Sequence, residues 1–292
     1  MKYVSIYTIL ISFLLPDIKD SIHLKLKDLS TYKKKYNVNI MPVNDPDKIK
    51  SETHLFEGQL NEIRLQAKNY IIEPATKTDV VIMETTRGTM KLKLFPDIAP
   101  NHCNNFKKLA NSGFYDETGF HRVIPGFMIQ GGDLNTRDGD PKNDGRGGPG
   151  WTVDAEFSDL PHKRGTLSMA RSTDPNSAGS QFFICDAYAQ HLNGKYTVFG
   201  EVIENFSVID KIVNSTTEYS NAKRNCLTEI PKNSIDTWVT LKDPKGRALL
   251  YSKVPEGRNK VEFQREMQSL LSSDRPLALP KIKKVRVVKG TE

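Results

Sequence analysis

The stretch FHRVIPGFMIQGGD, residues 120–133, places one cation among aromatic and apolar side chains. Arg122 stands near Phe120, Phe127 and Met128, which suggests a guanidinium at the edge of an apolar pocket. A buried strand with a single arginine facing solvent accounts for the same residues. This stretch taken alone therefore leaves both interpretations open.

The other reactive side chains form no familiar catalytic pattern. The histidines lack HxH and HExxH spacing and the three cysteines lack CxxC spacing, so we expect no metal and no cofactor. The sequence also has no GxSxG motif of hydrolases and no GxxxxGK[ST] phosphate loop. Cys185 lies in a strand-like run and is interpreted as core rather than as a nucleophile.

More motifs follow the first one in a fixed order. They are GRGGPG from Gly145, GTLSMAR from Gly165, SAGSQFFIC from Ser177, LNGKYTVFGEV from Leu192 and VIDKI from Val208. Together with residues 120–133 they resemble the cyclophilin family of peptidyl-prolyl cis–trans isomerases. The resemblance runs from about residue 80 to 214, resumes at 274–288, and covers half of the chain.

The resemblance implies an isomerase of X-Pro peptide bonds that assists protein folding. Rotation about such a bond meets a barrier of about 18–20 kcal/mol and transfers no group. A twisted amide leaves a lone pair on nitrogen, and a guanidinium can donate a hydrogen bond to it. Arg122 matches the family's catalytic arginine, and Gln130 is implied to hold Arg122 in place and to contact the substrate backbone.

Position-for-position matching implies the rest of the site. Phe127, Met128, Phe183 and Leu192 are expected to form the apolar proline pocket. Alternation along a strand sends Phe182 and Phe183 to opposite faces, and we assign Phe183 to the pocket. The remaining substrate-binding residues implied by the match are Ala170, Arg171, Ser172, Gln181, His191 and Tyr196.

The rim of this site departs from the family pattern at three positions. His191 stands where many eukaryotic members have a tryptophan linked to cyclosporin binding, so sensitivity to that drug stays open. Arg171 replaces a frequent asparagine, which leaves the preference for the residue before proline open. Tyr196 replaces a histidine and keeps a ring that can form hydrogen bonds.

Short strands with few helices predict a mainly β fold. Met90, Leu92 and Leu94 alternate with lysines, which is typical of a half-buried strand. We expect a closed eight-stranded antiparallel cyclophilin-like barrel capped by two α-helices, over residues 79–292. The segment at about 214–273 fits poorly and is interpreted as an insertion before the last strand.

The chain before this domain has no chemical motif. Residues 1–16 start with a lysine and a short apolar run, which resembles a signal or a membrane anchor, and 17–78 are read as an extension and linker. We therefore expect an exported protein, either periplasmic, secreted or membrane-anchored. A cytoplasmic location stays open, because no small-residue cleavage site follows residue 15.

Partners follow from charge and from the resemblance. The net charge of +7 is concentrated near the two ends, where lysine runs are typical of solvated tails, so we expect no nucleic acid. The expected partners are proline-containing peptides and unfolded proteins, with membrane contact only through an uncleaved N-terminal segment, and the chain is expected to be a monomer. A proline-peptide binding module without catalysis is the alternative function.

Overall fold

The computed structural model describes residues 54–230, 237–246 and 249–290. The signal-like segment 1–16 and residues 17–53 of the extension lie outside the described residues. Within the described part, no helix combines the length and the apolar character that a membrane span needs. The helix α4 (Glu57–Asn69) is the regular element of the extension in this part, and its Leu60 and Ala67 are buried.

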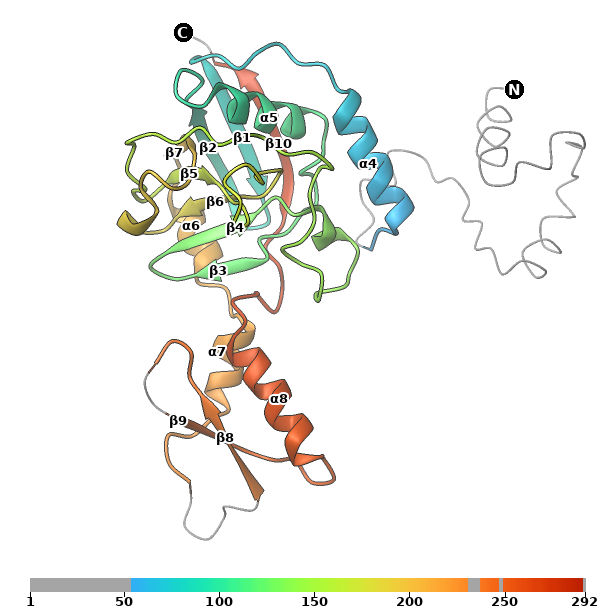
Figure 1. Cartoon of the computed structure of the whole chain (residues 1–292), viewed down its shortest axis with the longest axis vertical. Helices are drawn as coiled ribbons and strands as arrows, with labels where there is room; N and C mark the ends of the chain where they lie inside the picture. Colours follow the sequence, from blue (N-terminus) through green and yellow to red (C-terminus); the bar gives the residue numbers. More distant parts are fainter. Residues whose placement is uncertain (1–53, 231–236, 247–248, 291–292) are drawn as a thin grey trace, which may run out of the picture. The chain divides into compact units, whose positions relative to one another are not determined.

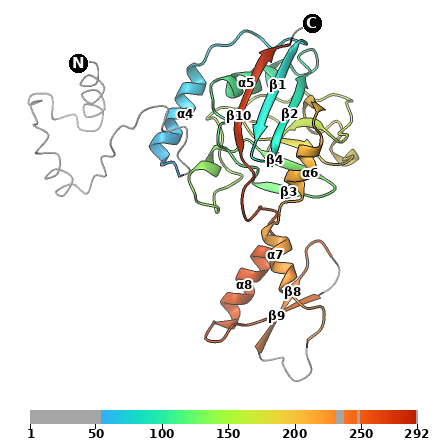
Figure 2. The same ribbon diagram turned by 180° about the vertical axis from the view of Figure 1, so that it is seen from behind.

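Eight strands form one antiparallel sheet (Figure 1). Their order across the sheet is β10-β1-β2-β7-β5-β6-β4-β3. The bounds are β1 (Asp79–Thr85), β2 (Gly88–Leu94), β3 (Arg122–Ile124), β4 (Met128–Gly131), β5 (Thr166–Met169), β6 (Phe182–Cys185), β7 (Val198–Glu204) and β10 (Ile282–Lys289). The view from behind shows β10 beside β1, which in turn lies beside β2 (Figure 2).

The hairpin of β1 and β2 shows how the sequence sets the sheet's faces. Met90, Leu92 and Leu94 are buried, as the alternation predicted, while Lys91 and Lys93 lie on the opposite face. The two lysines pair with Glu204 and Glu201 of the neighbouring strand β7. Apolar residues thus point into the core and charged residues line the outer surface of this hairpin.

The sheet curls but does not form the closed barrel that we predicted. Its strand order ends at β10 and β3, which do not pair as strands within the described residues. One isolated bridge between Gly119 and Lys281 and a backbone hydrogen bond from Phe120 to Pro280 link the two edges. Because β3 has only three residues, it is too short to continue the ladder around to β10.

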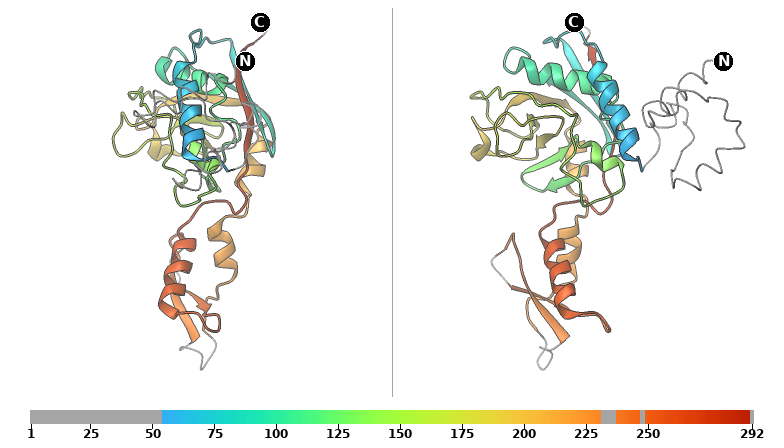
Figure 3. Two further views of the ribbon diagram at one scale, coloured as in Figure 1. Left: turned by 90° about the vertical axis from the view of Figure 1, so that its right-hand side faces the viewer. Right: turned by 45° about the vertical axis from the view of Figure 1, so that its right-hand side comes forward.

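Two helices of the predicted domain pack on the sheet. Helix α5 (Pro100–Asn111) begins with a proline, whose missing N–H is not needed in the first turn. Helix α6 (Ser207–Val213) follows β7 directly. Both contribute to the main hydrophobic core, which also includes Phe106, Tyr115 and Phe182. Figure 3 shows α5 lying along the curled sheet.

Residues 215–276, here called the inserted module, separate α6 from β10. They hold α7 (Glu218–Arg224), β8 (Trp238–Lys242), β9 (Leu249–Lys253) and α8 (Lys260–Leu271). Helices α7 and α8 pack side by side in both views of Figure 3. The module keeps a hydrophobic core of its own, formed by Ala222, Val239, Leu241, Leu250, Phe263, Met267 and Leu271.

Candidate active site

Strand register places the candidate catalytic arginine in a row of side chains across four strands. Arg122 of β3 pairs with Gln130 of β4, Gln130 pairs with Phe183 of β6, and Phe183 pairs with Ser168 of β5. Directly paired residues in an antiparallel sheet point to the same face. Arg122, Gln130 and Phe183 therefore share one face, and the alternate residues point into the main core.

An apolar cluster lies beside this row on the same face. Its buried members include Met128, Phe183 and Leu192, and the half-buried Phe127 and Tyr196 pack against them. The ring of Phe183 lies 5.9 Å from Tyr196 in an edge-on arrangement. The structure thus brings together the residues assigned to the proline pocket.

The neighbouring phenylalanine points the other way. Phe182 belongs to the main core, where its ring meets Phe106 and Tyr115 edge-on, each at 5.6 Å between ring centres. The ring of Phe183 stacks instead on His162, at 5.9 Å and 14°. Alternation along β6 therefore separates a core ring from a ring on the site's face, as the sequence predicted.

The rim residues that depart from the family pattern lie at the edge of the apolar cluster. His191 is exposed, and its ring lies 5.3 Å from that of Phe127. The guanidinium of Arg171 lies 4.6 Å over the ring of Tyr196 and donates to the carbonyl of Lys195 at 2.9 Å. This cation–π contact holds the Arg171 charge at the rim.

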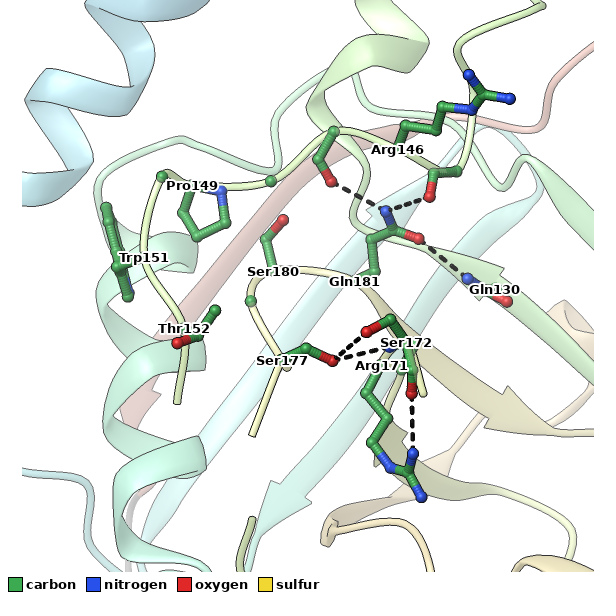
Figure 4. A pocket seen from close by; sticks show the side chains of 16 residues that line it. Gln130, Arg146, Pro149, Trp151, Thr152, Arg171, Ser172, Ser177, Ser180 and Gln181 are labelled. Carbon is green, nitrogen blue, oxygen red and sulfur yellow. Dashed lines mark hydrogen bonds between the residues drawn. The ribbon is translucent and has the colours of Figure 1, made fainter. Parts of the chain in front are cut away.

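A polar cavity of about 570 Å³ adjoins the apolar cluster (Figure 4). Its walls include five residues assigned from the sequence, namely Gln130, Ala170, Arg171, Ser172 and Gln181. Ala170 also packs against the apolar cluster, so the two halves of the site meet there. The sequence did not assign the other lining residues, 145–152 with Ser177, Gly179 and Ser180, although the GRGGPG and SAGSQFFIC motifs that contain many of them belong to the resemblance.

The amide of Gln181 joins the two walls of the cavity. Its Nε2 donates to the carbonyls of Gly145 and Gly147, each at 2.9 Å, and its Oε1 accepts from Nε2 of Gln130 at 3.0 Å (Figure 4). A Cβ atom at Gly147 would lie 2.6 Å from Oδ1 of Asn135, so this close approach requires glycine. The sequence thus builds a loop that Gln181 can hold through backbone atoms.

Arg122 has a polar partner that the sequence did not indicate. Its Nε lies 3.4 Å from Oδ2 of Asp274, a residue at the end of the inserted module. The other carboxylate oxygen of Asp274 accepts from Nζ of Lys245. We assigned Gln130 to hold Arg122, but the Gln130 amide donates to Gln181, while the Arg122 side chain remains 46% exposed.

Burial perturbs two titratable groups next to the arginine. The pKa of His121 is lowered to about 4 by its burial, with the positive charges of Arg122 and Arg275 adding to the effect. The pKa of Asp133 is raised to about 6, mainly because it is buried, although backbone N–H groups of Asn135 and Gly145 oppose the rise. His121 is therefore neutral around pH 7, and the charge at this edge of the site belongs to Arg122.

Two buried thiols are poorly suited to nucleophilic chemistry. Burial raises the pKa of both Cys103 and Cys185 to about 12, so each carries a proton at neutral pH. Cys185 is a fully buried member of the apolar cluster, which agrees with its interpretation as a buried packing residue rather than a nucleophile. The site thus offers a fixed cation, hydrogen-bonding amides and an apolar surface.

Comparison with known proteins assigns the family. Residues 80–232 match the family described as cyclophilin type peptidyl-prolyl cis-trans isomerase. A peptidyl-prolyl cis-trans isomerase of Synechococcus elongatus is 48% identical over 134 residues, which are 46% of this chain and 86% of that protein. A probable peptidyl-prolyl cis-trans isomerase of Brucella suis is 43% identical over 156 residues, covering 52% of this chain and 80% of that protein.

A solved structure of a cyclophilin type isomerase from Cryptosporidium parvum, determined in the presence of the dipeptide Ala-Pro, is 28% identical. The match covers 72% of this chain and 98% of that one, with a TM-score of 0.48. From the family match and its relatives, the chain belongs to the cyclophilin type peptidyl-prolyl cis-trans isomerases. The predicted family is thereby confirmed.

Proposed function

We propose that this chain accelerates the cis–trans isomerisation of X-Pro bonds and that Arg122 stabilises the twisted amide. The observation that carries this proposal is the row of Arg122, Gln130 and Phe183 on one face of the sheet, next to the apolar cluster. The row puts a guanidinium beside a surface that suits a proline ring. Family membership supports the same reaction.

The isomerisation requires few groups beyond those in this arrangement. Rotation about the X-Pro bond breaks amide conjugation and localises a lone pair on the nitrogen. A donor that reaches the nitrogen only in the twisted state lowers the barrier, because it binds the transition state better than either planar isomer. Arginine suits the role, since its guanidinium stays charged and donates from a rigid plane.

Substrate binding is divided between the two halves of the site. The apolar cluster around Phe183 and Leu192 receives the proline ring in this proposal. The polar cavity, which Ala170 and Gln181 line, receives the peptide on the amino-terminal side of the proline. Arg171 and His191 at the rim then set preferences between peptides, because both are held at the edge of the apolar cluster.

A peptide assay with Arg122→Ala tests the proposal. Interconversion of a proline-containing peptide is followed by exchange NMR or by a coupled assay, and the variant is expected to lose about 100-fold in kcat/KM, as for removal of one transition-state donor. Arg87→Ala is the matched control, because Arg87 is exposed in the turn between β1 and β2. Unchanged turnover in Arg122→Ala would contradict the role of Arg122, and tight binding without acceleration by the native chain would support the non-catalytic alternative.

Assistance to protein folding and export from the cytoplasm are also proposals. Slow X-Pro isomerisation limits the refolding of many chains, so an active isomerase with an open site is suited to unfolded clients. Export is supported by the lysine and apolar run of residues 1–16. Refolding of a proline-limited client with and without the chain tests the first, and N-terminal sequencing of the protein from its native compartment tests the second.

A further inference from the structure

The base of the inserted module is a fixed piece of backbone. Where the chain enters and leaves the module, Glu218 donates to the carbonyl of Arg275 at 2.8 Å and Tyr219 donates to that of Ser273 at 3.1 Å. Nε of Arg275 also donates to the carboxylate of Asp144 at 2.6 Å. Asp274 lies between these anchors, so its position does not depend on a free loop.

Asp274 contacts β3 twice. Its carbonyl oxygen accepts a hydrogen bond from the backbone N–H of Val123 at 3.0 Å. Its side-chain Oδ2 lies 3.4 Å from Nε of Arg122. The carboxylate is only 15% exposed, compared with 46% for the Arg122 side chain. The well-anchored carboxylate of Asp274 thus contacts the long Arg122 side chain, which would otherwise sample many rotamers.

The Asp274 carboxylate has two basic partners, Arg122 and Lys245. Lys245 donates to the second oxygen of the same carboxylate, and its Nζ lies 4.1 Å over the ring of Tyr219. One negative charge is therefore shared by two positive ones. The contact to Arg122 is made through Nε and does not use the two Nη groups.

We propose that Asp274 is a positioning residue for the isomerisation, holding the Arg122 guanidinium in the orientation that meets the twisted amide. The proposal rests on the proposed catalytic role of Arg122. Catalytic groups must be held within narrow limits of their working geometry, and supporting hydrogen bonds provide this restraint. In this chain the restraint on the family's arginine comes from the inserted module, across 152 residues of sequence.

A set of full-length variants tests the proposal through kcat and KM for a proline-containing peptide. Asp274→Asn is expected to lower kcat by roughly tenfold, as for a misplaced reacting group, and to leave KM within about twofold. In an Arg122→Ala background the same substitution is expected to have no further effect on kcat, because the group that it positions is gone. A purely structural role would give additive losses instead.

Asp243→Asn is the matched control. It makes the same substitution in the same module, but the side chain of Asp243 accepts from Lys223, Tyr219 and the backbone N–H of Lys245 rather than from Arg122. We expect kcat of this variant to stay within about twofold of the native value, even where its thermal unfolding midpoint falls. An equal loss of kcat in Asp243→Asn and Asp274→Asn would show dependence on module integrity and overturn the proposal.

The remaining outcomes separate the two proposals. If Arg122→Ala loses activity and Asp274→Asn keeps a native kcat, Asp274 is not a positioning residue while the proposed function stands. A higher kcat in Asp274→Asn also overturns the proposal, since Asp274 would then hold Arg122 away from the substrate. If Arg122→Ala itself keeps native turnover, the catalytic role of Arg122 fails first.

Discussion

The eight-stranded sheet and the inserted module differ in what their surfaces do. The sheet encloses a large core, and its other face carries the apolar cluster and the polar cavity. The module buries a small core of its own. Among the residues that the structure describes, its contacts with the candidate site and the adjoining Asp144 are made at its base, through Asp274 and Arg275.

In our proposal, the sheet binds the peptide and the module adjusts the catalytic arginine. The sheet supplies the surface that a proline peptide needs, and the strand register fixes that surface. The module supplies one carboxylate next to the arginine and one arginine next to Asp144, which precedes the cavity wall. An insertion can thus modify a catalytic group without contributing to the pocket itself.

The largest expected effect on stability lies in the core of the sheet. Phe182→Ala is expected to lower the free energy of unfolding by about 3–5 kcal/mol, because it removes a fully buried ring that packs against Phe106 and Tyr115. Phe183→Ala, one residue along, is expected to cost less stability but to raise KM. Chemical denaturation and peptide turnover measure the pair, and a reversed pattern would contradict the assignment of the two faces.

The module's core gives the second test. Leu241 is fully buried there, beside Phe263, Met267 and Leu271. Leu241→Ala is expected to cost about 2–5 kcal/mol and to lower hydrogen-exchange protection in β8 and β9. Protection in β1 and β5 is expected to stay native. An equal loss in the sheet would show that sheet and module unfold as one unit.

The sequence predicted the sheet's face much better than the module's base. Motif order and period-two alternation sufficed to separate Phe182 from Phe183 and to place Arg122 beside an apolar cluster. Asp274 carried no comparable signal, because its contact with Arg122 joins residues far apart in sequence and none of the motifs quoted above includes Asp274. The sequence analysis did not predict helix α7 either, because its seven residues bury only Ala222 and so show no apolar periodicity.

The sequence also did not allow us to predict correctly whether the sheet closes into a barrel. The cyclophilin-like fold that we expected has eight strands, as observed, but whether the edges meet depends on strand lengths and twist. The segment before the three-residue β3 joins the start of β10 by a bridge at Gly119 and a few backbone hydrogen bonds, and β3 itself does not pair with β10. Local patterns thus predicted the faces of the strands but not how far the ladder extends.

The third prediction concerns acid stability at the boundary between the two regions. The folded pKa of His121, about 4, lies below the ordinary value of 6.5, so the unfolded chain takes up this proton first as the pH falls. The contribution of His121 to the free energy of unfolding is therefore lost between about pH 6.5 and pH 4, by roughly 3 kcal/mol at most. Nearby Arg122 and Arg275 face the ring and strengthen the effect.

His121→Gln isolates this effect from an opposing one. Asp133 has a folded pKa of about 6, above its ordinary 3.8, so its uptake of a proton stabilises the fold as the pH falls through the same range. The free energy of unfolding is measured by denaturation at several pH values for the native chain and for His121→Gln. Subtracting the variant's value from the native value removes the Asp133 contribution, because both chains contain it. A native-minus-variant difference that stays constant between pH 7 and pH 4 would contradict the assignment to His121.

The smallest expected effect comes from labelling the cysteines, which compares the two regions directly. Cys103 of α5 and Cys185 of β6 are fully buried in the domain that contains the sheet, and burial raises the pKa of each to about 12. Cys226 of the module is half-buried, and its pKa is also raised by burial. Because a thiolate must meet the reagent, labelling requires both exposure and loss of the proton.

We therefore expect a thiol-alkylating reagent to modify Cys226 first in the native chain at pH 8, as followed by mass spectrometry of peptides. Cys103 and Cys185 should react only as fast as the sheet and its covering helix open, so Phe182→Ala should speed their labelling and Leu241→Ala should not. Labelling of Cys185 before Cys226 would mean that the apolar cluster opens more readily than the module. The module, not the sheet that carries the pocket, would then be the more rigid region of the chain.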